Sequence, residues 1–469
     1  MLITLNKIDD RKNLYKQIYL RIKGQVLEGR LQAHEKLPSK RQLAEQLNVS
    51  VNTVTSAYEQ LLAEGYIYTK ERKGYYVENI TPFIQKGKRH EQSLPEDLKE
   101  QHFTGEGWLS LSHMTSDIAM FPFHEWMKCQ QKALMNHKYE LSEVSHYQGP
   151  YLVRQSIARL IAMSRGVVCK PEQIVIGAGT QLLIRNLMDL NEKGTVVAME
   201  DPGYSRFYTL LADMGFDVHT LAIDDKGIAM NEVEATDINY LFVTPSHQFP
   251  TGKIMPIARR VELLNWSIKK TDRYIIEDDY DSEFKYETDN IPSLQSLDQN
   301  QRIIYTGTFS KTMLPGLRIS YMVLPPDILR KYREKYRYFM QSSNVLSLYT
   351  LYYFIETGGY ARHLKRMTHH YESKRKELIA HICRRFGKRV VIEDIPAGLH
   401  FLAWFKTRKT YEQVEKAAKQ EKLEIYTMRR FMLTKRYETA GMVELVLGFA
   451  SIGEEEISEA VERLGRVLE

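Results

Sequence analysis

Between residues 14 and 65, apolar side chains recur at every third or fourth position, which is the spacing of one buried face of an α-helix. The period is four from Leu14 to Leu27, and this stretch is predicted to be an amphipathic helix. Two shorter helices follow, the first capped by Ser39 and the second by Ser50, with a tight turn between them. Residues 66–77 then predict a small β-hairpin, which completes a small α+β head.

Farther along the chain, short apolar runs alternate with helical patterns. The runs predicted to be strands are 174–176, 195–199, 240–243, 274–276, 303–304 and 321–324. This alternation predicts an α/β body, in which a largely parallel sheet carries helices on both faces. Residues 398–405 predict a strand of a smaller C-terminal subdomain, and residues 454–468 predict a final helix.

Residues 79–107 separate these two patterns. They are polar, carry prolines and glycines and show no sustained apolar period, so they predict a linker between a head, residues 1–78, and a body, residues 108–469. Charge follows the same division. Residues 1–90 hold 16 Lys and Arg against 9 Asp and Glu, a net charge of +7, which leaves 49 against 50 for the rest. A basic head on a near-neutral body is typical of nucleic-acid binding, with a merely solvated basic face as the alternative.

The three cysteines of the 469 residues are far apart and form no CxxC pair, so neither a disulfide framework nor a zinc site is predicted. The N-terminus lacks the apolar segment of a signal peptide, and no run of about 18 apolar residues occurs. We therefore expect a reduced, cytoplasmic protein without a metal and without a membrane-spanning segment.

Residues 305–321, YTGTFSKTMLPGLRISY, offer one lysine, Lys311, in a setting suited to an aldehyde cofactor. Thr308 and Ser310 can donate hydrogen bonds to a phosphate, and Arg318 can pair with it bidentately. The apolar run just before this stretch predicts a buried strand. Lys311 would then follow the carboxyl end of that strand, where ligands bind in open α/β sheets.

Two other predicted strands are also followed by residues with suitable chemistry. Gly179 and Thr180 open a helical run after the first strand of the body, so their backbone N–H groups can cradle a phosphate. In the stretch EDPGYSRF, Tyr204 offers an aromatic face to a ring and Arg206 offers a partner to a carboxylate.

The stretch EDDYDSEF follows a further strand and supplies a carboxylate and a phenol. Asp278 can keep a heteroaromatic nitrogen protonated, and Tyr280 can form a hydrogen bond with a ring hydroxyl. A lysine, a carboxylate, a stacking ring, a phenol and a phosphate cup are together what a pyridoxal phosphate site requires. The neighbouring Asp279, Asp281 and Glu283 are expected to be surface charges.

The head carries a specific motif, LPSKRQLAEQLNVSVNTVTSAYEQLLAEG, from Leu37 to Gly65. It resembles the winged helix-turn-helix of the GntR family, whose second helix enters the major groove of DNA. The resemblance implies DNA contacts by Ser39, Lys40, Arg41, Ser50, Asn52, Thr53 and Lys73, with the lysines as phosphate partners. Ser39 and Ser50 could instead serve only as helix caps, and Arg41 as a solvated charge. Val51 stands where the family commonly has Arg, so the operator sequence of relatives does not carry over.

Motifs of the body occur in the order found in fold-type I aminotransferases. They are HYQGPYLVRQSIARLI at 146–161, IVIGAGTQ at 174–181, EDPGY at 200–204, PSHQFPTG at 245–252, EDDY at 277–280 and TFSKTMLPGLR at 308–318. Joined to a GntR-type head, this body resembles the MocR (GabR-like) subfamily of GntR transcriptional regulators. The resemblance implies the pyridoxal-phosphate-dependent transferase fold type I, with a smaller C-terminal subdomain.

The resemblance also assigns roles to residues. It implies that Lys311 forms a Schiff base, the internal aldimine, with pyridoxal phosphate, that Asp278 pairs with the pyridine nitrogen, and that Tyr280 contacts the ring hydroxyl. Tyr204 would stack on the cofactor ring. The phosphate would be held by Gly179, Thr180, Thr308, Ser310 and Arg318.

Two positions depart from ordinary aminotransferases. Phe249 stands where the usual Asn bonds the ring hydroxyl, and Val446 stands where many such enzymes have an Arg for the substrate α-carboxylate. The chain therefore lacks a bidentate carboxylate clamp, and we expect at most partial transamination of common α-amino acids. The substitutes for that clamp would be Arg206 and one of Arg429 and Arg430.

The functional prediction is a cytoplasmic, homodimeric transcriptional regulator that binds a double-stranded DNA operator through its head. Its body would sense a small amine or amino-acid effector that displaces Lys311 to form an external aldimine. Three alternatives remain, namely an active aminotransferase with a DNA-binding accessory, a regulator that senses pyridoxal phosphate itself to control vitamin B6 synthesis, and a body without its cofactor. The effector, the operator and the sign of regulation are not predicted.

Overall fold

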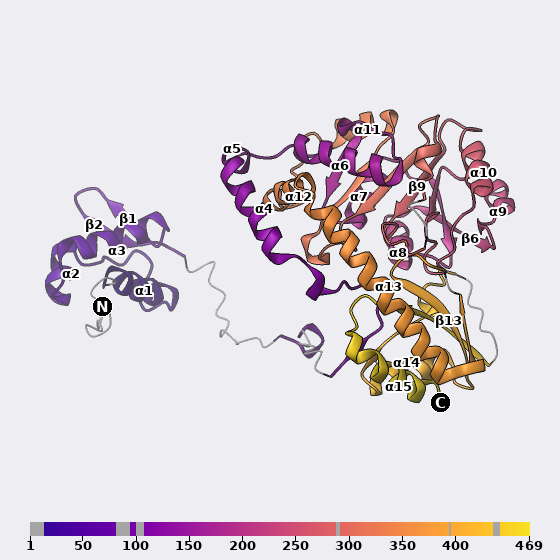
Figure 1. The fold of residues 1–469 in the computed structure, drawn as a ribbon. Helices are drawn as coiled ribbons and strands as arrows, with labels where there is room; N and C mark the ends of the chain where they lie inside the picture. The colour runs from indigo at the N-terminus through magenta and orange to yellow at the C-terminus, as the bar shows by residue number, and fades with distance from the viewer. Residues whose placement is uncertain (1–13, 81–93, 100–106, 288–290, 394, 435–440) are drawn as a thin grey trace. The chain divides into compact units, whose positions relative to one another are not determined.

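Two units, residues 1–104 and 105–469, make up the chain in this computed structural model, and each has hydrophobic cores of its own (Figure 1). The structure describes residues 14–80, 94–99, 107–287, 291–393, 395–434 and 441–469. Most of the predicted linker therefore lies outside the described residues. No helix in the described part of the chain is long and apolar enough to cross a membrane.

The first unit contains α1 (Leu14–Leu27), α2 (Lys40–Leu47), α3 (Val51–Ala63), β1 (Ile67–Lys70), β2 (Gly74–Val77) and a short 3₁₀ turn, η3 (Glu96–Leu98). Ser39 caps α2 in a reciprocal capping box with Gln42, and Ser50 caps α3 by accepting a hydrogen bond from the N–H of Thr53. Asn48 adopts the left-handed conformation that ends α2, which allows the tight turn. The predicted helix-turn-helix and hairpin are thus confirmed.

The body is built on one eight-stranded sheet. Its strands, in spatial order, are β4 (Ile174–Gly177), β11 (Ser320–Val323), β10 (Ile303–Thr308), β9 (Tyr274–Asp279), β8 (Tyr240–Val243), β5 (Val196–Asp201), β6 (Asp217–Asp224) and β7 (Gly227–Ile228). Only β11 and β7 run antiparallel to their neighbours, so the prediction of a largely parallel sheet is confirmed. The pattern of apolar residues did not predict β6 or β7, because β6 is mostly exposed or half-buried along its length.

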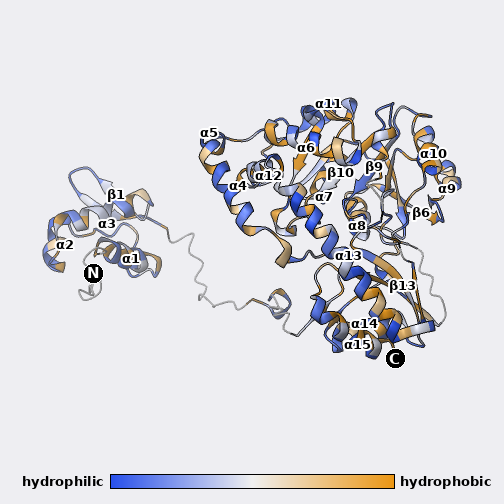
Figure 2. Ribbon diagram, in the orientation of Figure 1, coloured by the Kyte–Doolittle hydropathy of each residue, from blue (hydrophilic) through white to orange (hydrophobic). Residues whose placement is uncertain are grey.

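Helices cover both faces of this sheet because alternate residues of each strand point to opposite sides. Ile304 of β10 packs into the core formed with α7, α8 and α11, whereas its neighbours Ile303 and Tyr305 face α9, α10 and α4, α6, α12 on the other side. These helices are α4 (Phe123–Asn136), α6 (Tyr151–Arg165), α7 (Thr180–Met188), α8 (Ser205–Asp213), α9 (Met230–Ala235), α10 (Ile257–Ser267), α11 (Pro326–Tyr336) and α12 (Val345–Glu356). The short α5 (Lys138–Ser142) follows α4. Hydrophilic and hydrophobic segments alternate along helices such as α4 (Figure 2).

A smaller subdomain follows the long helix α13 (Gly359–Phe386). Its antiparallel sheet has the order β12 (Val390–Glu393), β13 (His400–Lys406), β16 (Met442–Gly448) and β15 (Tyr426–Thr427). Helices α13, α14 (Tyr411–Gln420) and α15 (Ile457–Leu468) pack on it in one apolar core. The start of the body also belongs here, because β3 (Leu109–Ser110) pairs with β14 (Leu423–Glu424). The predicted subdomain strand and final helix are confirmed.

Candidate functional site

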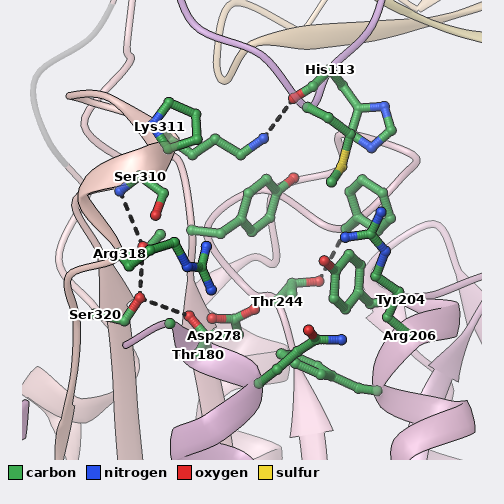
Figure 3. A pocket seen from close by; sticks show the side chains of 18 residues that line it. His113, Thr180, Tyr204, Arg206, Thr244, Asp278, Ser310, Lys311, Arg318 and Ser320 are labelled. Atoms are coloured by element: carbon green, nitrogen blue, oxygen red, sulfur yellow. Dashed lines mark hydrogen bonds between the residues drawn. The ribbon is translucent and has the colours of Figure 1, made fainter. Parts of the chain in front are cut away.

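The carboxyl ends of five strands border one cavity of about 200 Å³ in the body (Figure 3). The ends of β4, β5, β8, β9 and β10, and the segments that follow them, bring together residues that are far apart in the sequence. All nine residues predicted to hold a cofactor line this cavity, namely Gly179, Thr180, Tyr204, Asp278, Tyr280, Thr308, Ser310, Lys311 and Arg318. Arg206, predicted to meet an effector, also lines it.

Lys311 reaches into the cavity from the loop that follows β10. Its Nζ donates a hydrogen bond of 2.6 Å to the backbone carbonyl of His113 (Figure 3). Burial lowers the pKa of Lys311 to about 8, although the carboxylate of Asp281 acts in the opposite direction. A substantial fraction of this amine is therefore neutral near physiological pH and able to act as a nucleophile.

Asp278 lies at the end of β9, beside Thr306 of β10 in the parallel ladder. Thr306 Oγ1 donates a 2.8 Å hydrogen bond to Asp278 Oδ1. Burial raises the pKa of Asp278 to about 7, because no cation among the described residues pairs with this carboxyl group. A positively charged N–H group placed against Asp278 would stabilise its ionised form.

One end of the cavity is formed by hydroxyl groups and one arginine. Ser320 Oγ lies 2.8 Å from Thr308 Oγ1 and 3.4 Å from Thr180 Oγ1, so three hydroxyls converge there. Arg318 Nη2 donates a 3.0 Å hydrogen bond to the carbonyl of Ala178. Gly179 lies beside it at the N-terminus of α7, and a Cβ atom at Gly179 would fall 2.0 Å from Arg318 Nη2. This glycine therefore leaves the space in which the guanidinium fits.

Aromatic and apolar side chains enclose the opposite end. The centroid of the Phe249 ring lies 5.6 Å from the ring centroid of Tyr204, 5.8 Å from that of Tyr280 and 5.0 Å from that of Phe431. Phe249 belongs to one apolar cluster with Val446 on β16, and both are buried. The two positions that depart from aminotransferases therefore lie in the same cluster.

The expectation that Asp279, Asp281 and Glu283 are surface charges is wrong. Asp279 and Asp281 are buried, and Glu283 is half-buried. Asp279 and Asp281 can be buried because each has a partner in the interior of the body. Arg165 of α6 forms a 2.7 Å ion pair with Asp279, and His247 lies 3.0 Å from Asp281. Burial raises the pKa of Glu283 to about 8.

The three arginines predicted to bind an effector do not lie together. Arg206 lines the Lys311 cavity, whereas Arg429 and Arg430 line a separate hollow beside α14. Arg429 forms a 2.9 Å ion pair with Glu412. The guanidinium of Arg430 lies 4.3 Å from the centroid of the Tyr426 ring.

The residues predicted to contact DNA lie on the helix-turn-helix and the hairpin of the first unit. Arg41, Asn52 and Lys73 are exposed. The hydroxyls of Ser39 and Ser50 are engaged in helix caps, and Ser50 Oγ also lies 2.8 Å from Thr53 Oγ1. The half-buried Lys40 places its ammonium 5.5 Å from the centroid of the Tyr75 ring.

Sequence reasoning did not identify several residues that line the cavity, among them the polar residues His113, Thr244 and Ser320. Ser320 follows Arg318 by two positions and points to the same end because β11 runs antiparallel to β10, which a hydroxyl at that spacing could have signalled. His113 lies nearly 200 residues before Lys311 in the sequence. The segment around His113 carries no motif that could have identified it.

Comparison with known proteins agrees with both parts of the molecule. The model of the family "Bacterial regulatory proteins, gntR family" matches residues 14–77, and that of "Aminotransferase class I and II" matches residues 98–464. The solved structure of LysN, an α-aminoadipate aminotransferase from Thermus thermophilus, aligns with a TM-score of 0.69 at 23% identity, covering 77% of this chain and 92% of LysN. The body therefore has the aminotransferase fold of type I.

Relatives of similar length share the whole arrangement. The uncharacterized HTH-type transcriptional regulator YdeL of Bacillus subtilis is 36% identical over 453 residues, 96% of each chain. The probable rhizopine catabolism regulatory protein MocR of Rhizobium meliloti is 29% identical over 466 residues, 96% of this chain and 93% of that one. With a gntR-type head and an aminotransferase-type body, the chain belongs to the MocR-type subfamily of GntR proteins and is an HTH-type transcriptional regulator.

Proposed function

We propose that this regulator binds pyridoxal 5'-phosphate in the Lys311 cavity and uses it to sense a primary amine. Three features of the cavity support the cofactor. The half-buried amine of Lys311 is partly neutral, the half-buried carboxyl of Asp278 has no cation partner among the described residues, and Gly179 leaves room for Arg318 beside three hydroxyls. Pyridoxal phosphate supplies an aldehyde carbon that primary amines attack and a pyridinium that withdraws electrons from it.

Each residue has a defined task in this proposal. Lys311 holds the aldehyde carbon, Asp278 accepts the pyridinium N–H, and Tyr204 covers the ring. The phosphate is held by Gly179, Thr180, Thr308, Ser310 and Arg318. Arg206 is the cation of the cavity left for an anionic group of the effector, with Arg429 or Arg430 as its partner in a closed arrangement of the subdomains.

The effector acts by competing with Lys311 for the cofactor. A primary amine that took the place of Lys311 would release the lysine side chain. The binding energy between Arg206 and the effector would then favour one arrangement of the two subdomains over the other. The linker passes this change to the head and alters its affinity for the operator. We further propose a homodimer, so that two heads engage two half-sites of the operator.

The observation that carries the proposal is the convergence of the nine predicted residues on one cavity that a single lysine, Lys311, lines. It is tested by replacing Lys311 with Met and measuring the visible absorbance and the borohydride-stable label of protein incubated with pyridoxal phosphate. Lys285 provides a matched control, because burial also lowers its pKa to about 8 but it lies outside the cavity. Lys311→Met should abolish absorbance and label, whereas Lys285→Met should keep both.

Other outcomes would favour the alternatives. Equal labelling of wild type and Lys311→Met would show that the body does not hold the cofactor through Lys311. Turnover of a panel of amino acids would identify an active aminotransferase. If pyridoxal phosphate altered operator binding but no amine did, the protein would sense the cofactor itself.

A further inference from the structure

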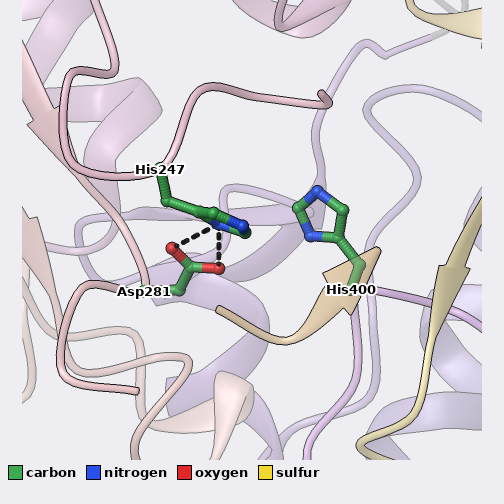
Figure 4. Close-up of side chains that lie close together, drawn as sticks. All are labelled: His247, Asp281 and His400. Atoms are coloured by element: carbon green, nitrogen blue, oxygen red, sulfur yellow. Dashed lines mark hydrogen bonds and ion pairs between the residues drawn. The ribbon is translucent and has the colours of Figure 1, made fainter. Parts of the chain in front are cut away.

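A buried pair, His247 and Asp281, lies directly behind Tyr280 of the cavity (Figure 4 shows the pair and the nearby His400). His247 Nδ1 lies 3.1 and 3.0 Å from the two carboxylate oxygens of Asp281. The hydroxyl oxygen of Tyr280 lies 3.0 Å from the same Nδ1. One ring nitrogen, which carries at most one proton, is therefore shared by a carboxylate and a phenol.

The location of that proton follows from the needs of the carboxylate. Asp281 is 1% exposed, and the backbone N–H of Leu399 donates to it over 3.3 Å. Burial by itself raises the pKa of Asp281, but His247, His400 and Lys285 hold it below its usual range. An ionised, buried carboxylate requires hydrogen-bond donors. Nδ1 of His247 therefore carries the ring proton and donates a hydrogen bond to Asp281.

The proton on Nδ1 determines what the Tyr280 hydroxyl can do. Because Nδ1 has no free lone pair, Tyr280 cannot donate to it and can only accept from it. Burial and the charges of Asp281 and Asp278 raise the pKa of Tyr280 well above its usual value, so the phenol keeps its own proton. That proton then points away from His247, and Tyr280 lines the cavity.

We propose that His247 and Asp281 are a positioning pair that makes Tyr280 a hydrogen-bond donor into the cavity. This inference rests on the proposed function, because the acceptor would be the ring oxygen of the bound cofactor. The pair does not touch the reacting atoms and acts through Tyr280. In a chain where Phe249 replaces the usual amide donor, Tyr280 is the donor left for that oxygen.

The surrounding backbone is shaped to hold the pair. Gly398 has φ of +69°, and a Cβ atom there would lie 2.1 Å from His247 Cε1 and 2.6 Å from Asp281 Oδ2. The backbone at Gly398 can therefore approach the pair only because it lacks a side chain. His247 Nε2 is buried and has no hydrogen-bond partner within the described part of the chain, so Nδ1 is the ring nitrogen that is engaged.

A metal site is the competing interpretation of this cluster. His247, Asp281 and His400 offer ligand atoms within 4.8 Å of one another. The Nδ1 proton donated to Asp281 removes one nitrogen from such a set, and His400 Nε2 lies 3.1 Å from the carbonyl of Pro250. The hydrogen bonds therefore favour the positioning pair, and metal binding becomes an outcome of the test.

The first test follows the visible absorbance of the full-length protein with its lysine-bound cofactor as pH changes. The ring oxygen of the cofactor accepts a hydrogen bond from the proton of the lysine–cofactor linkage. A second donor makes this oxygen a weaker acceptor, so the loss of that donor should raise the apparent pKa of the linkage. Tyr280→Phe and His247→Ala should each raise it by about one pH unit. The double variant should shift no further than Tyr280→Phe alone.

Conservative variants separate positioning from packing. His247→Asn keeps an N–H donor and should titrate near wild type. Asp281→Asn and Asp281→Ala both remove the carboxylate that requires a donor, and both should resemble His247→Ala. His137→Ala removes another buried imidazole, one that stacks on Tyr349, and should leave the titration unchanged. A wild-type titration in His247→Ala, or additive shifts in the double variant, would overturn the proposal.

The second test needs no cofactor and so separates this inference from the proposed function. In protein labelled with ¹⁵N-histidine, the His247 signals, assigned by their loss in His247→Ala, should show a protonated Nδ1 and an unprotonated Nε2. Asp281→Ala should move the proton to Nε2. A protonated Nε2 in the wild type, or His247 signals changed by one equivalent of Zn²⁺, would refute the positioning pair.

Discussion

Gly179 is the residue on which the position of Arg318 in the cavity depends. Its φ is +110°, and an added Cβ would fall 2.0 Å from Arg318 Nη2, so any side chain displaces the guanidinium. Gly316 lies near Arg318 in the sequence, but a Cβ there would meet nothing within 4 Å. The two glycines therefore differ in the space around them, although each lies within two residues of a residue that is proposed to bind the phosphate.

Gly179→Ala should weaken pyridoxal phosphate binding by about 10- to 100-fold, the loss expected when one charge-assisted hydrogen bond is removed. Gly316→Ala is the matched control and should bind normally. Fluorescence titration of cofactor-free protein measures both dissociation constants. Equal affinities would mean that Arg318 does not hold the phosphate.

Lys311 makes cofactor capture depend on pH in a defined direction. Only the neutral amine attacks an aldehyde, and burial lowers the pKa of Lys311 to about 8 from an ordinary value of 10.5. The capture rate should therefore rise about tenfold per pH unit below pH 8 and level off above it. Stopped-flow absorbance from about pH 6 to 10, with N-acetyl-lysine amide as reference, checks this. A rate that keeps rising beyond pH 9 would show an ordinary lysine.

At the scale of elements, regular patterns were predictable and local folding was not. The six predicted strands of the large sheet exist because their apolar runs are buried on both faces, and α1 spans the predicted residues. The burial of the acidic residues at the end of β9 was not predicted, because consecutive acidic residues usually lie at the surface. Their partners Arg165 and His247 come from distant segments of the sequence. Likewise, His113 meets Lys311 through its backbone carbonyl, a contact that no side-chain pattern encodes.

Helix α2 allows structural and DNA-contacting roles to be separated. Ser39 caps this helix, so Ser39→Ala should lower the free energy of unfolding of the head by about 1 kcal/mol. Exposed Arg41, on the first turn of the same helix, should change stability by less than about 0.5 kcal/mol when replaced by Ala, but should abolish operator preference.

Thermal melting and operator footprints of both variants, at fixed salt, measure these effects. Arg41→Ala should keep weak, salt-sensitive binding to unrelated DNA. An unchanged footprint for Arg41→Ala would place base recognition elsewhere on the head. A normal melting temperature for Ser39→Ala would remove its capping role.

At the scale of the whole molecule, the two units have separate cores. Residues 14–80 contain one apolar core, and those of the aminotransferase-type body lie within residues 105–469. The cavity that contains Lys311 is therefore formed by the body alone. In the proposed homodimer, cooperation between the units would depend on the linker and on two heads acting together.

Residues 105–469 expressed alone should retain the absorbance of the lysine-bound cofactor and its response to amines. The full-length protein should bind an operator with two half-sites about 10²- to 10⁴-fold more tightly than a single half-site, because the second head binds intramolecularly. Spectra and DNA titrations at equal salt test both statements. Equal affinity for one and two half-sites would argue against a two-headed dimer.

The cluster that joins Phe249 to Val446 couples these two positions. Phe249→Asn alone would leave a buried amide among apolar neighbours, and Val446→Arg alone would bury a charge beside a phenylalanine. Each single change therefore costs stability. A sequence that exchanged both residues one at a time would have to pass through a less stable intermediate.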